Sequence, residues 1–149
     1  MKPILLGMNN PLSDDPADAL VPWPVGCSGH RLYRVLADVR PGTTEDDYTG
    51  RFDRRNLLRI QAWNGADARA AASAFAGSLP PGSVVVALGE GVRRALGLPR
   101  MLVHPWRHSP GVTVRQLPHP SGRNPWYGHP AHRLLAGLLL AELYDGALE

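Results

Sequence analysis

Short apolar runs alternate with helix-like segments along this chain, and that alternation restricts its fold more than any other feature. The clearest run, Ser83–Gly89, holds three consecutive valines and no charged residue, as a buried strand does. Strands that alternate with helices form a mostly parallel sheet with helices on both faces. We therefore predict an α/β fold of three layers, αβα, around a mostly parallel four-stranded sheet.

Residue type and periodicity place the individual elements. Strands are expected at Pro3–Met8, Leu57–Ile60, Ser83–Gly89 and Val112–Leu117. Helices are expected at Ser28–Asp38, with Ser28 as the N-cap, and at Ala66–Leu79, Glu90–Leu98 and Pro130–Tyr144. An irregular loop is expected over Leu12–Cys27, and irregular or briefly helical structure over Arg40–Arg55.

Length and composition narrow the protein class. The chain has 149 residues, of which 44% are hydrophobic, so we expect a single domain over residues 1–149. No apolar stretch reaches the roughly 18 residues of a spanning helix, and Met1–Gly7 is too short for a signal peptide core. We expect a cytoplasmic monomer with no membrane partner. Cys27 is the only cysteine, which excludes an intramolecular disulfide and a cysteine-ligated iron–sulfur cluster.

The charge balance is mildly positive. One lysine and fifteen arginines oppose thirteen acidic residues, giving a formal net charge of +3. This balance suits a partner with a phosphate backbone. An arginine-rich, alanine-rich and lysine-poor composition is also typical of a GC-rich genome, so net charge alone does not identify a partner.

Two polar loops follow expected strands at opposite ends of the chain. Gly7-Met8-Asn9-Asn10-Pro11 follows the first apolar run, and His119-Pro120-Ser121-Gly122-Arg123-Asn124 follows the last expected strand. In an open α/β sheet the carboxyl ends of the strands form the ligand crevice. The two loops are therefore expected to converge on one site.

These loops resemble the two motifs of the uracil-DNA glycosylase superfamily. Gly7-Met8-Asn9 is similar to the Gly-Met-Asn-Pro-Gly and Gly-Ile-Asn-Pro-Gly motifs of its single-strand-selective and mismatch-specific branches. The segment from His119 to Asn124 is similar to the His-Pro-Ser-Pro-Arg-Asn of the single-strand-selective branch. The first motif departs from the pattern, because Asn10 and Pro11 stand where the family has Pro and Gly. A second register aligns Asn10-Pro11 with the family's Asn-Pro, so the catalytic asparagine is either Asn9 or Asn10.

The resemblance implies a glycosylase mechanism without metal or organic cofactor. His119 would stabilise the negative charge that develops on the departing base, as oxyanion-hole donors do. Asn9 would hold the water that attacks the oxocarbenium-like sugar. Asp14 and Asp15, which lie close by in sequence, offer a carboxylate alternative, although adjacent loop acids are more often solvated.

The resemblance also implies the substrate contacts. Asn56 would read the edge of uracil with its side-chain amide, the alternative being a strand-entry residue that bonds its own backbone. A flipped base also needs an aromatic stacking face, for which Trp23 is the candidate and Phe52 another, with ordinary loop packing as the alternative for Trp23. Gly7, Met8 and Asn10 would line the base site. Ser121, Gly122 and Arg123 would contact DNA, with Arg123 as the wedge that fills the gap in the duplex.

Histidine spacing raises the possibility of a metal site. His104 and His108 are four residues apart, and His129 and His132 are three apart. A proline directly follows His104 and His129, which prevents a helical ligand pair, and no Cys or acidic cluster accompanies them. We expect no metal.

The sequence thus favours a DNA glycosylase that removes uracil, or a 5-substituted uracil, from DNA by base flipping. One alternative is a catalytically silent nucleic-acid-binding module of the same fold, which the altered first motif favours. Another is an enzyme that acts on a modified base or on free nucleotides through the same crevice.

Overall fold

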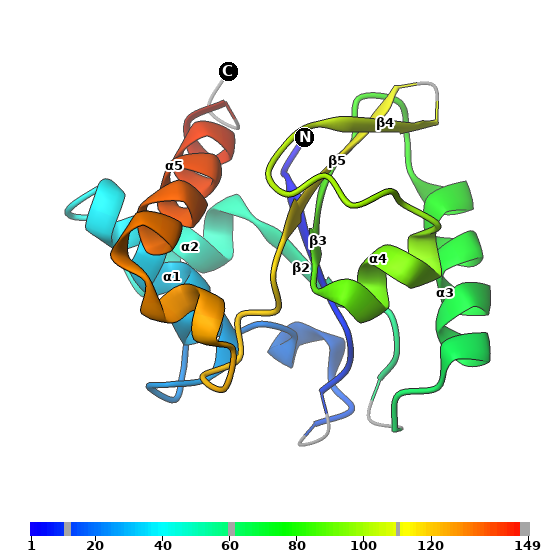
Figure 1. The fold of residues 1–149 in the computed structure, drawn as a ribbon, viewed down its shortest axis with the longest axis horizontal. Helices are drawn as coiled ribbons and strands as arrows, with labels where there is room; N and C mark the ends of the chain where they lie inside the picture. The colour runs from blue at the N-terminus through cyan, green and yellow to red at the C-terminus, as the bar shows by residue number, and fades with distance from the viewer. Residues whose placement is uncertain (11–12, 60–61, 110, 147–149) are drawn as a thin grey trace.

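The computed structural model describes residues 1–10, 13–59, 62–109 and 111–146 (Figure 1). Pro11, Leu12 and Ile60, which belong to segments assigned above, lie outside the described residues. The strands are β1 (Ile4–Gly7), β2 (Asp53–Asn56), β3 (Val84–Leu88), β4 (Trp106–Ser109) and β5 (Val112–Leu117). The helices are α1 (Ser28–Val39), α2 (Glu45–Arg51), α3 (Gly65–Ser78), α4 (Glu90–Leu96) and α5 (Pro130–Gly146), with short 3₁₀ turns η1 (Pro16–Asp18) and η2 (Pro125–Gly128).

The expected α/β class is confirmed, and the expected number of strands is wrong. In the described residues the sheet has five strands in the order β2-β1-β3-β5-β4. The pairs β2–β1, β1–β3 and β3–β5 are parallel, whereas β4 is antiparallel to β5. Sequence patterns missed β4 because it is a short edge strand without an apolar run, and Trp106 and Arg107 are both exposed.

The second strand begins four residues earlier than expected. Asp53–Asn56 pairs with β1, whereas the apolar residues Leu57 and Leu58 follow the strand. Edge strand β2 carries polar side chains, so its sequence lacks the apolar run that marks a buried strand. Asn56 consequently stands at the carboxyl end of the strand, opposite Gly7, and not at the amino end as expected.

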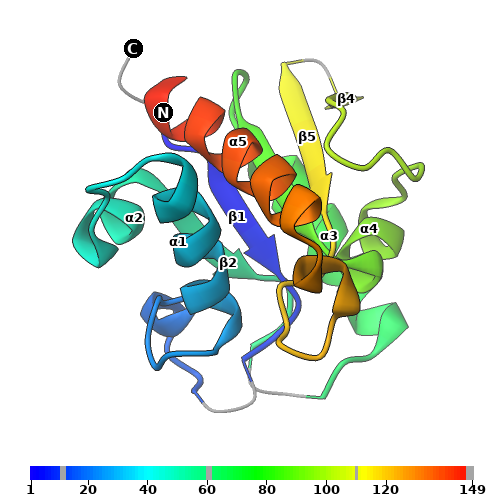
Figure 2. The ribbon, with the colours of Figure 1, turned by 60° about the vertical axis from the view of Figure 1, so that its left-hand side comes forward.

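Helices cover both faces of the sheet, as the three-layer prediction requires. Figures 1 and 2 show α1, α2 and α5 on one side of the sheet and α3 and α4 on the other. Side chains along β1 point alternately to the two faces of the sheet. Leu5 belongs to the core under α1 and α5, whereas Ile4 and Leu6 belong to the core under α4. No helix within the described parts of the chain is both long and apolar enough to cross a membrane.

Helix boundaries follow local capping chemistry. The N-cap of α1 is Cys27, whose Sγ accepts a hydrogen bond from the backbone N–H of His30, so the expected cap Ser28 is instead the first helical residue. Helix α2, in a segment expected to be irregular or briefly helical, begins at a capping box in which Thr44 and Asp47 bond each other's backbone. This box explains why a polar segment forms a stable turn of helix.

Candidate functional site

The carboxyl ends of the parallel strands open into a pocket of about 670 Å³. Its walls come from the ends of β1, β2 and β3, from the segment between β1 and α1, and from the loop after β5. The lining includes these residues singled out from the sequence: Gly7, Met8, Asn9, Asn10, Trp23, Asn56, His119, Ser121 and Gly122. The two motif loops, more than a hundred residues apart in sequence, therefore meet at one pocket, as expected. Arg123 does not line it and lies exposed on the adjoining loop.

Hydrogen bonds within the loop after β5 fix its shape. The Ser121 backbone N–H donates to His119 Nδ1 at 3.1 Å, and Asn124 Nδ2 donates to the His119 carbonyl at 2.9 Å. The Tyr127 hydroxyl, buried beneath the loop, donates to the Pro118 carbonyl at 2.8 Å. The loop thus holds His119 mainly through its own residues.

These contacts define the protonation of His119. A ring nitrogen that accepts a hydrogen bond carries no proton, so the neutral imidazole carries its proton on Nε2. Burial lowers the pKa of His119 below its ordinary value of 6.5. At neutral pH, His119 is an uncharged ring that offers an Nε2–H donor at the pocket.

Gly89 sets how closely β3 approaches His119. Its φ is +95°, in the region that favours glycine, and a Cβ there would lie 3.0 Å from the Cβ of His119. The Gly89 N–H also donates to the Leu117 carbonyl at 2.9 Å. The end of β3 therefore packs directly against the histidine loop because this position has no side chain.

Gly7 has the corresponding role for Asn56. The two residues face each other across the β1–β2 pair, and a Cβ on Gly7 would lie 2.5 Å from Asn56 Oδ1. The half-buried Asn56 amide occupies the space beside Gly7, at the pocket wall. Within the described residues no hydrogen bond engages this amide, so the structure does not support a role in bonding its own backbone.

The two candidate asparagines have different surroundings. Asn10 donates its backbone N–H to the Arg59 carbonyl at 3.0 Å and its Nδ2 to the Asp18 carbonyl at 3.4 Å. It lines both the large pocket and a smaller neighbouring one, whereas Asn9 lines only the large pocket. Asn10 thus joins neighbouring segments of backbone, and Asn9 is the asparagine associated with the large pocket alone.

Residues far away in sequence hold the segment between β1 and α1. The Tyr48 hydroxyl donates to the Leu20 carbonyl at 2.9 Å, and Arg54 Nη1 donates to the carbonyls of Ala17 and Ala19 at 3.2 and 2.8 Å. Leu20 has a φ of +51°, an uncommon conformation for a residue with a side chain. Contacts from α2 and β2 therefore add to the local hydrogen bonds of this segment, such as that between Ser13 and Asp18.

The structure separates the two candidates for base stacking. Trp23 lines the large pocket and is 51% exposed. Phe52 is buried in the core between Tyr48 and Tyr144, so it cannot contact a ligand in this pocket and the expectation for it is wrong. Met8 also lines the pocket and packs with Trp63 in the core beneath α3 and α4.

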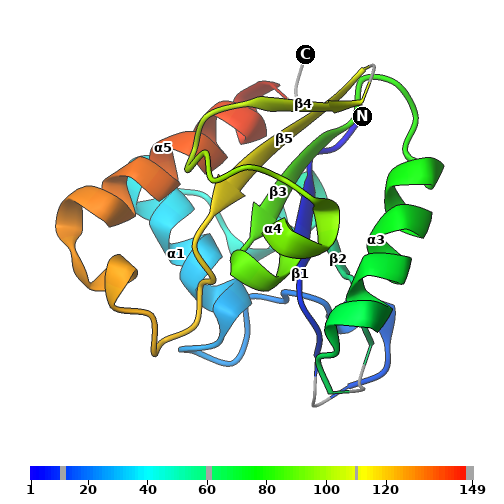
Figure 3. The same cartoon turned by 45° about the vertical axis from the view of Figure 1, so that its right-hand side comes forward.

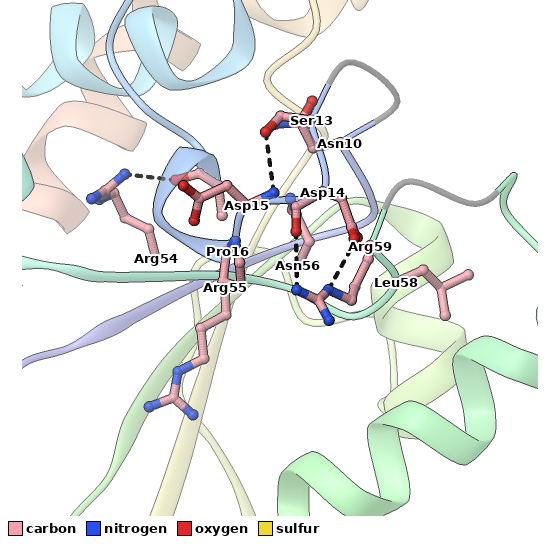
Figure 4. Close-up of a pocket in the computed structure, with 11 residues that line it drawn as sticks. Asn10, Ser13, Asp14, Asp15, Pro16, Arg54, Arg55, Asn56, Leu58 and Arg59 are labelled. Carbon is pink, nitrogen blue, oxygen red and sulfur yellow. Dashed lines mark hydrogen bonds and ion pairs between the residues drawn. The ribbon is translucent and has the colours of Figure 1, made fainter.

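A smaller pocket, of about 300 Å³, adjoins the large one and shares Asn10, Ser13 and Asn56 with it (Figure 4). Asp14 lines this smaller pocket, where its carboxylate pairs with Arg59 Nε at 3.2 Å. Asp15 also lines it and accepts a hydrogen bond from the Ala17 backbone N–H. Neither aspartate lines the large pocket, so the carboxylate alternative is not supported for these two residues.

Asp18 is the acidic residue that sequence reasoning missed. It is the one carboxylate among the described residues that line the large pocket, and its Oδ2 accepts a hydrogen bond from Ser13 Oγ at 2.6 Å. Leu20 and Cys27 were also missed as lining residues. The number of prolines and aspartates marked this segment as a loop over the site, but no local signal indicated which of its side chains reach the pocket.

The four histidines considered for metal binding have other contacts or lie apart. His132 stacks on Trp126 with ring centroids 4.5 Å apart, and its Nδ1 lies 2.8 Å from the Trp126 carbonyl. His108 Nε2 lies 3.1 Å from the Leu96 carbonyl, and His104 is exposed. In the parts of the chain that the structure describes, no group of three or more His, Cys, Asp or Glu residues is arranged to hold a metal ion.

Comparison with models of known protein families gave no match to this chain, and comparison with curated proteins gave none. The family resemblance noted above therefore rests on the two motifs themselves.

The large pocket combines complementary polar groups. It has a neutral N–H donor at His119, two amides at Asn9 and Asn56, one carboxylate at Asp18, and a partly exposed indole at Trp23. Such a pocket is suited to a flat, neutral, polar ring with adjacent donors and acceptors. A nucleobase has these properties.

Proposed function

We propose that this protein is a DNA glycosylase that hydrolyses the N-glycosidic bond of uracil, or of a 5-substituted uracil, after the base is flipped out of the DNA strand. The observation that carries the proposal is that the His119 loop and the Gly7-Met8-Asn9 loop line one pocket, in which His119 is neutral with its proton on Nε2. The likeness of these two loops to the motifs of uracil-DNA glycosylases supports the same reaction.

His119 would stabilise the departing base. When the glycosidic bond breaks, its electron pair moves to the base, and negative charge develops on the base oxygen nearest the bond. An uncharged donor held by the protein stabilises such an oxyanion, and removing one donor typically costs about 3–4 kcal/mol of transition-state stabilisation. The internal bonds of the loop hold the ring in place before substrate arrives.

Asn56 would identify the base. The N3–H and O4 of uracil are an adjacent donor and acceptor, which one amide side chain can match with its carbonyl and its NH₂. Cytosine presents the opposite pattern on this edge and would leave the half-buried amide facing mismatched groups. The proposal is supported by the position of Asn56 at the carboxyl end of β2, beside Gly7.

Asn9 would position the attacking water. An amide is a poor base, but a dissociative reaction needs a well-placed water more than an early proton transfer. The carboxylate of Asp18, in the same pocket, is a second group that can accept the proton. After attack, the sugar carries a hydroxyl at C1′ and the free base leaves with the proton it gains from solvent.

The test is release of free base from single-stranded and duplex oligonucleotides that each carry one uracil or one 5-hydroxymethyluracil. We expect the native chain to release base and His119→Ala to be slower by roughly 10²–10³-fold. His104→Ala is the matched control, because His104 is exposed and does not line the pocket, and it should keep native activity. Equal loss in both variants, or none in either, would contradict the role given to His119.

A further inference from the structure

A further pocket, of about 460 Å³, adjoins the proposed base site at His119. His119 is the residue that lines both pockets, and Gly89 and Pro118 extend the wall of the second one. Helix α4 and the segment after it form the opposite side. Figure 3 shows α4 beside the segment that leaves β5 toward the histidine loop.

Three arginines surround one carboxylate, that of Glu90. Arg93 and Arg100 line this second pocket, and Arg94 lies beside it, paired with the same carboxylate. Glu90 pairs with Arg93 Nη2 at 2.8 Å, with Arg94 Nε at 3.6 Å and with Arg100 Nε at 3.0 Å. The hydrogen bond from Arg93 and the nearby arginine charges lower the pKa of Glu90, so its carboxylate is ionised at neutral pH. We call Arg93, Arg94 and Arg100 the arginine cluster.

The three arginines of the cluster differ in how far their side chains are exposed and in the contacts that they make. The Arg93 side chain is only 18% exposed, and its Nη1 also donates to the Leu98 carbonyl at 2.7 Å, so it supports the fold. The side chains of Arg94 and Arg100 are 72% and 74% exposed. These two guanidinium groups keep most of their surface open to a partner.

The charge in this region is unbalanced. One carboxylate faces three guanidinium groups, which leaves two positive charges uncompensated, and Glu90 is the one acidic residue among the described residues that line the pocket. Exposed ion pairs of this kind stabilise a fold by about 0–1 kcal/mol each. Stability therefore gives little reason to gather three arginines around one glutamate.

We infer that the arginine cluster binds the phosphodiester backbone of a DNA strand next to the nucleotide whose base occupies the His119 pocket. The inference rests on the proposed function, since the strand is that of the proposed substrate. Neighbouring phosphates of one strand lie within a few ångströms of each flipped nucleotide, and arginine is well suited to hold phosphate through paired N–H donors. Met101 and the partly exposed Leu102 line the same pocket and offer apolar surface to an adjacent base or sugar.

The inference separates a polynucleotide substrate from a free nucleotide. A free nucleoside monophosphate has one phosphate, attached to its own sugar, and needs no contact beyond the first pocket. A DNA strand continues past the flipped nucleotide, and its affinity depends on salt in proportion to the phosphates that the protein neutralises. If Arg94 and Arg100 contact phosphates, replacing them should make the affinity for the strand less dependent on salt concentration.

The experiment measures binding of a fluorescein-labelled oligodeoxycytidylate, which contains neither uracil nor thymine, by fluorescence anisotropy over a series of salt concentrations. For the double variant Arg94→Gln/Arg100→Gln we expect the slope of log affinity against log salt to become shallower by about 1.4, since each contact with a single strand contributes about 0.7. The variant Arg94→Lys/Arg100→Lys, which keeps both charges, should retain most of the native slope.

Arg107→Gln is the matched control. Arg107 is exposed on β4 and pairs with Thr113 near the amino end of β5, whereas the pockets lie at the carboxyl ends of the strands. This substitution removes one of the two positive charges that the double variant removes, at a site away from the pockets, and should leave the slope native. Thermal unfolding of each variant verifies that the exposed substitutions leave the fold intact.

A native slope in the double Gln variant, or an equal decrease in Arg107→Gln, would overturn the inference. Failure of the native chain to bind the oligonucleotide would also overturn it. Base release is measured separately with the uracil substrates. If the native chain releases base but the double variant keeps the native slope, the phosphate-binding role of the arginine cluster is refuted and the glycosylase activity is not. If the slope depends on the cluster but no base is released, the glycosylase activity is refuted and the phosphate-binding role is not.

Discussion

The two loops that meet at the large pocket are each anchored by a buried tyrosine, but they are built in different ways. The Tyr127 hydroxyl bonds the Pro118 carbonyl, in a loop that also bonds itself through His119, Ser121 and Asn124. The Tyr48 hydroxyl bonds the Leu20 carbonyl, in a segment that has local bonds such as Ser13 to Asp18 and that Arg54 also bonds from β2. The histidine loop is held by residues close to it in sequence, whereas the other segment combines local bonds with anchors from the distant elements α2 and β2.

This difference has a consequence for function. The self-supporting loop presents the proposed catalytic histidine, whose position tolerates little error. The segment with distant anchors presents Trp23, Asp18 and the cap of α1 to the same pocket. Substitutions far from the pocket should therefore affect the Trp23 side more than the His119 side. The predictions below test this difference, in order of their expected effect on the free energy of unfolding.

Gly29→Ala should cause the largest loss of stability, about 3 kcal/mol. A methyl group at this position would overlap the carbonyl oxygens of Leu20 and Val21, and backbone atoms cannot rotate out of the way. Urea unfolding measures the loss. Gly77→Ala is the control, since nothing lies near its Cβ on α3, and it should be neutral or stabilising by up to about 1 kcal/mol. Equal stability of the two variants would show that the segment is not packed against α1 as described.

Tyr48→Phe and Tyr127→Phe should each cost about 1–2 kcal/mol, because each leaves one loop carbonyl without its buried donor. Their effects on base release should differ. Tyr48→Phe should reduce it more, because the segment around Leu20 loses one of its external anchors while the His119 loop keeps its internal bonds. A larger loss in Tyr127→Phe would reverse the comparison between the two loops.

The titration of His119 should change the free energy of unfolding by a smaller amount, and only at acid pH. Burial lowers the pKa of this histidine in the folded chain below 6.5, so the unfolded chain binds the proton more readily. The contribution of His119 to the free energy of unfolding is therefore constant above pH 6.5. As pH falls below that value, protonation of the unfolded chain makes the contribution increasingly destabilising. We expect the difference in unfolding free energy between the native chain and His119→Asn to follow this course in urea titrations. A difference that does not change with pH would mean that His119 is not buried in its neutral form.

Trp23→Ala should change stability least, by within about 0.5 kcal/mol, because the side chain is already half exposed. Stacking on a base is worth about 1–3 kcal/mol, so the KM for base release should rise by roughly 5- to 150-fold. Trp106→Ala, on β4 away from the pocket, is the control and should leave KM unchanged. An unchanged KM in Trp23→Ala would remove this residue from the proposed base site.

The features that could be predicted from the sequence are those that local residues determine. The apolar runs at β1, β3 and β5 gave three parallel strands, and the polar loops after β1 and β5 gave the pocket. The prediction places strand β2 four residues late, because this edge strand carries polar side chains, including the half-buried Arg54, and no apolar run. Strand β4 was missed for the related reason that its exposed residues show no periodicity.

The remaining features of the site depend on contacts that local sequence does not encode. The hydrogen bond from the Tyr48 hydroxyl to the Leu20 carbonyl joins α2 to a loop 28 residues away in sequence. Asn56 lies beside Gly7 because of the register in which β2 pairs with β1. Asp18 enters the pocket and Asp14 does not, because Arg59 pairs with Asp14 from the segment after β2. Only the folded arrangement distinguishes these aspartates.

The central claim is that the two loops form one site for uracil in DNA, and it is tested most directly by release of free uracil from a single-stranded oligonucleotide by the native chain, Asn9→Ala and Asn10→Ala. The native chain should release uracil, Asn9→Ala should lose most of that activity, and Asn10→Ala should retain more of it, because Asn10 joins neighbouring backbone segments. Binding of the oligonucleotide without release of any base would contradict the claim and would identify the pocket as part of a catalytically silent DNA-binding module.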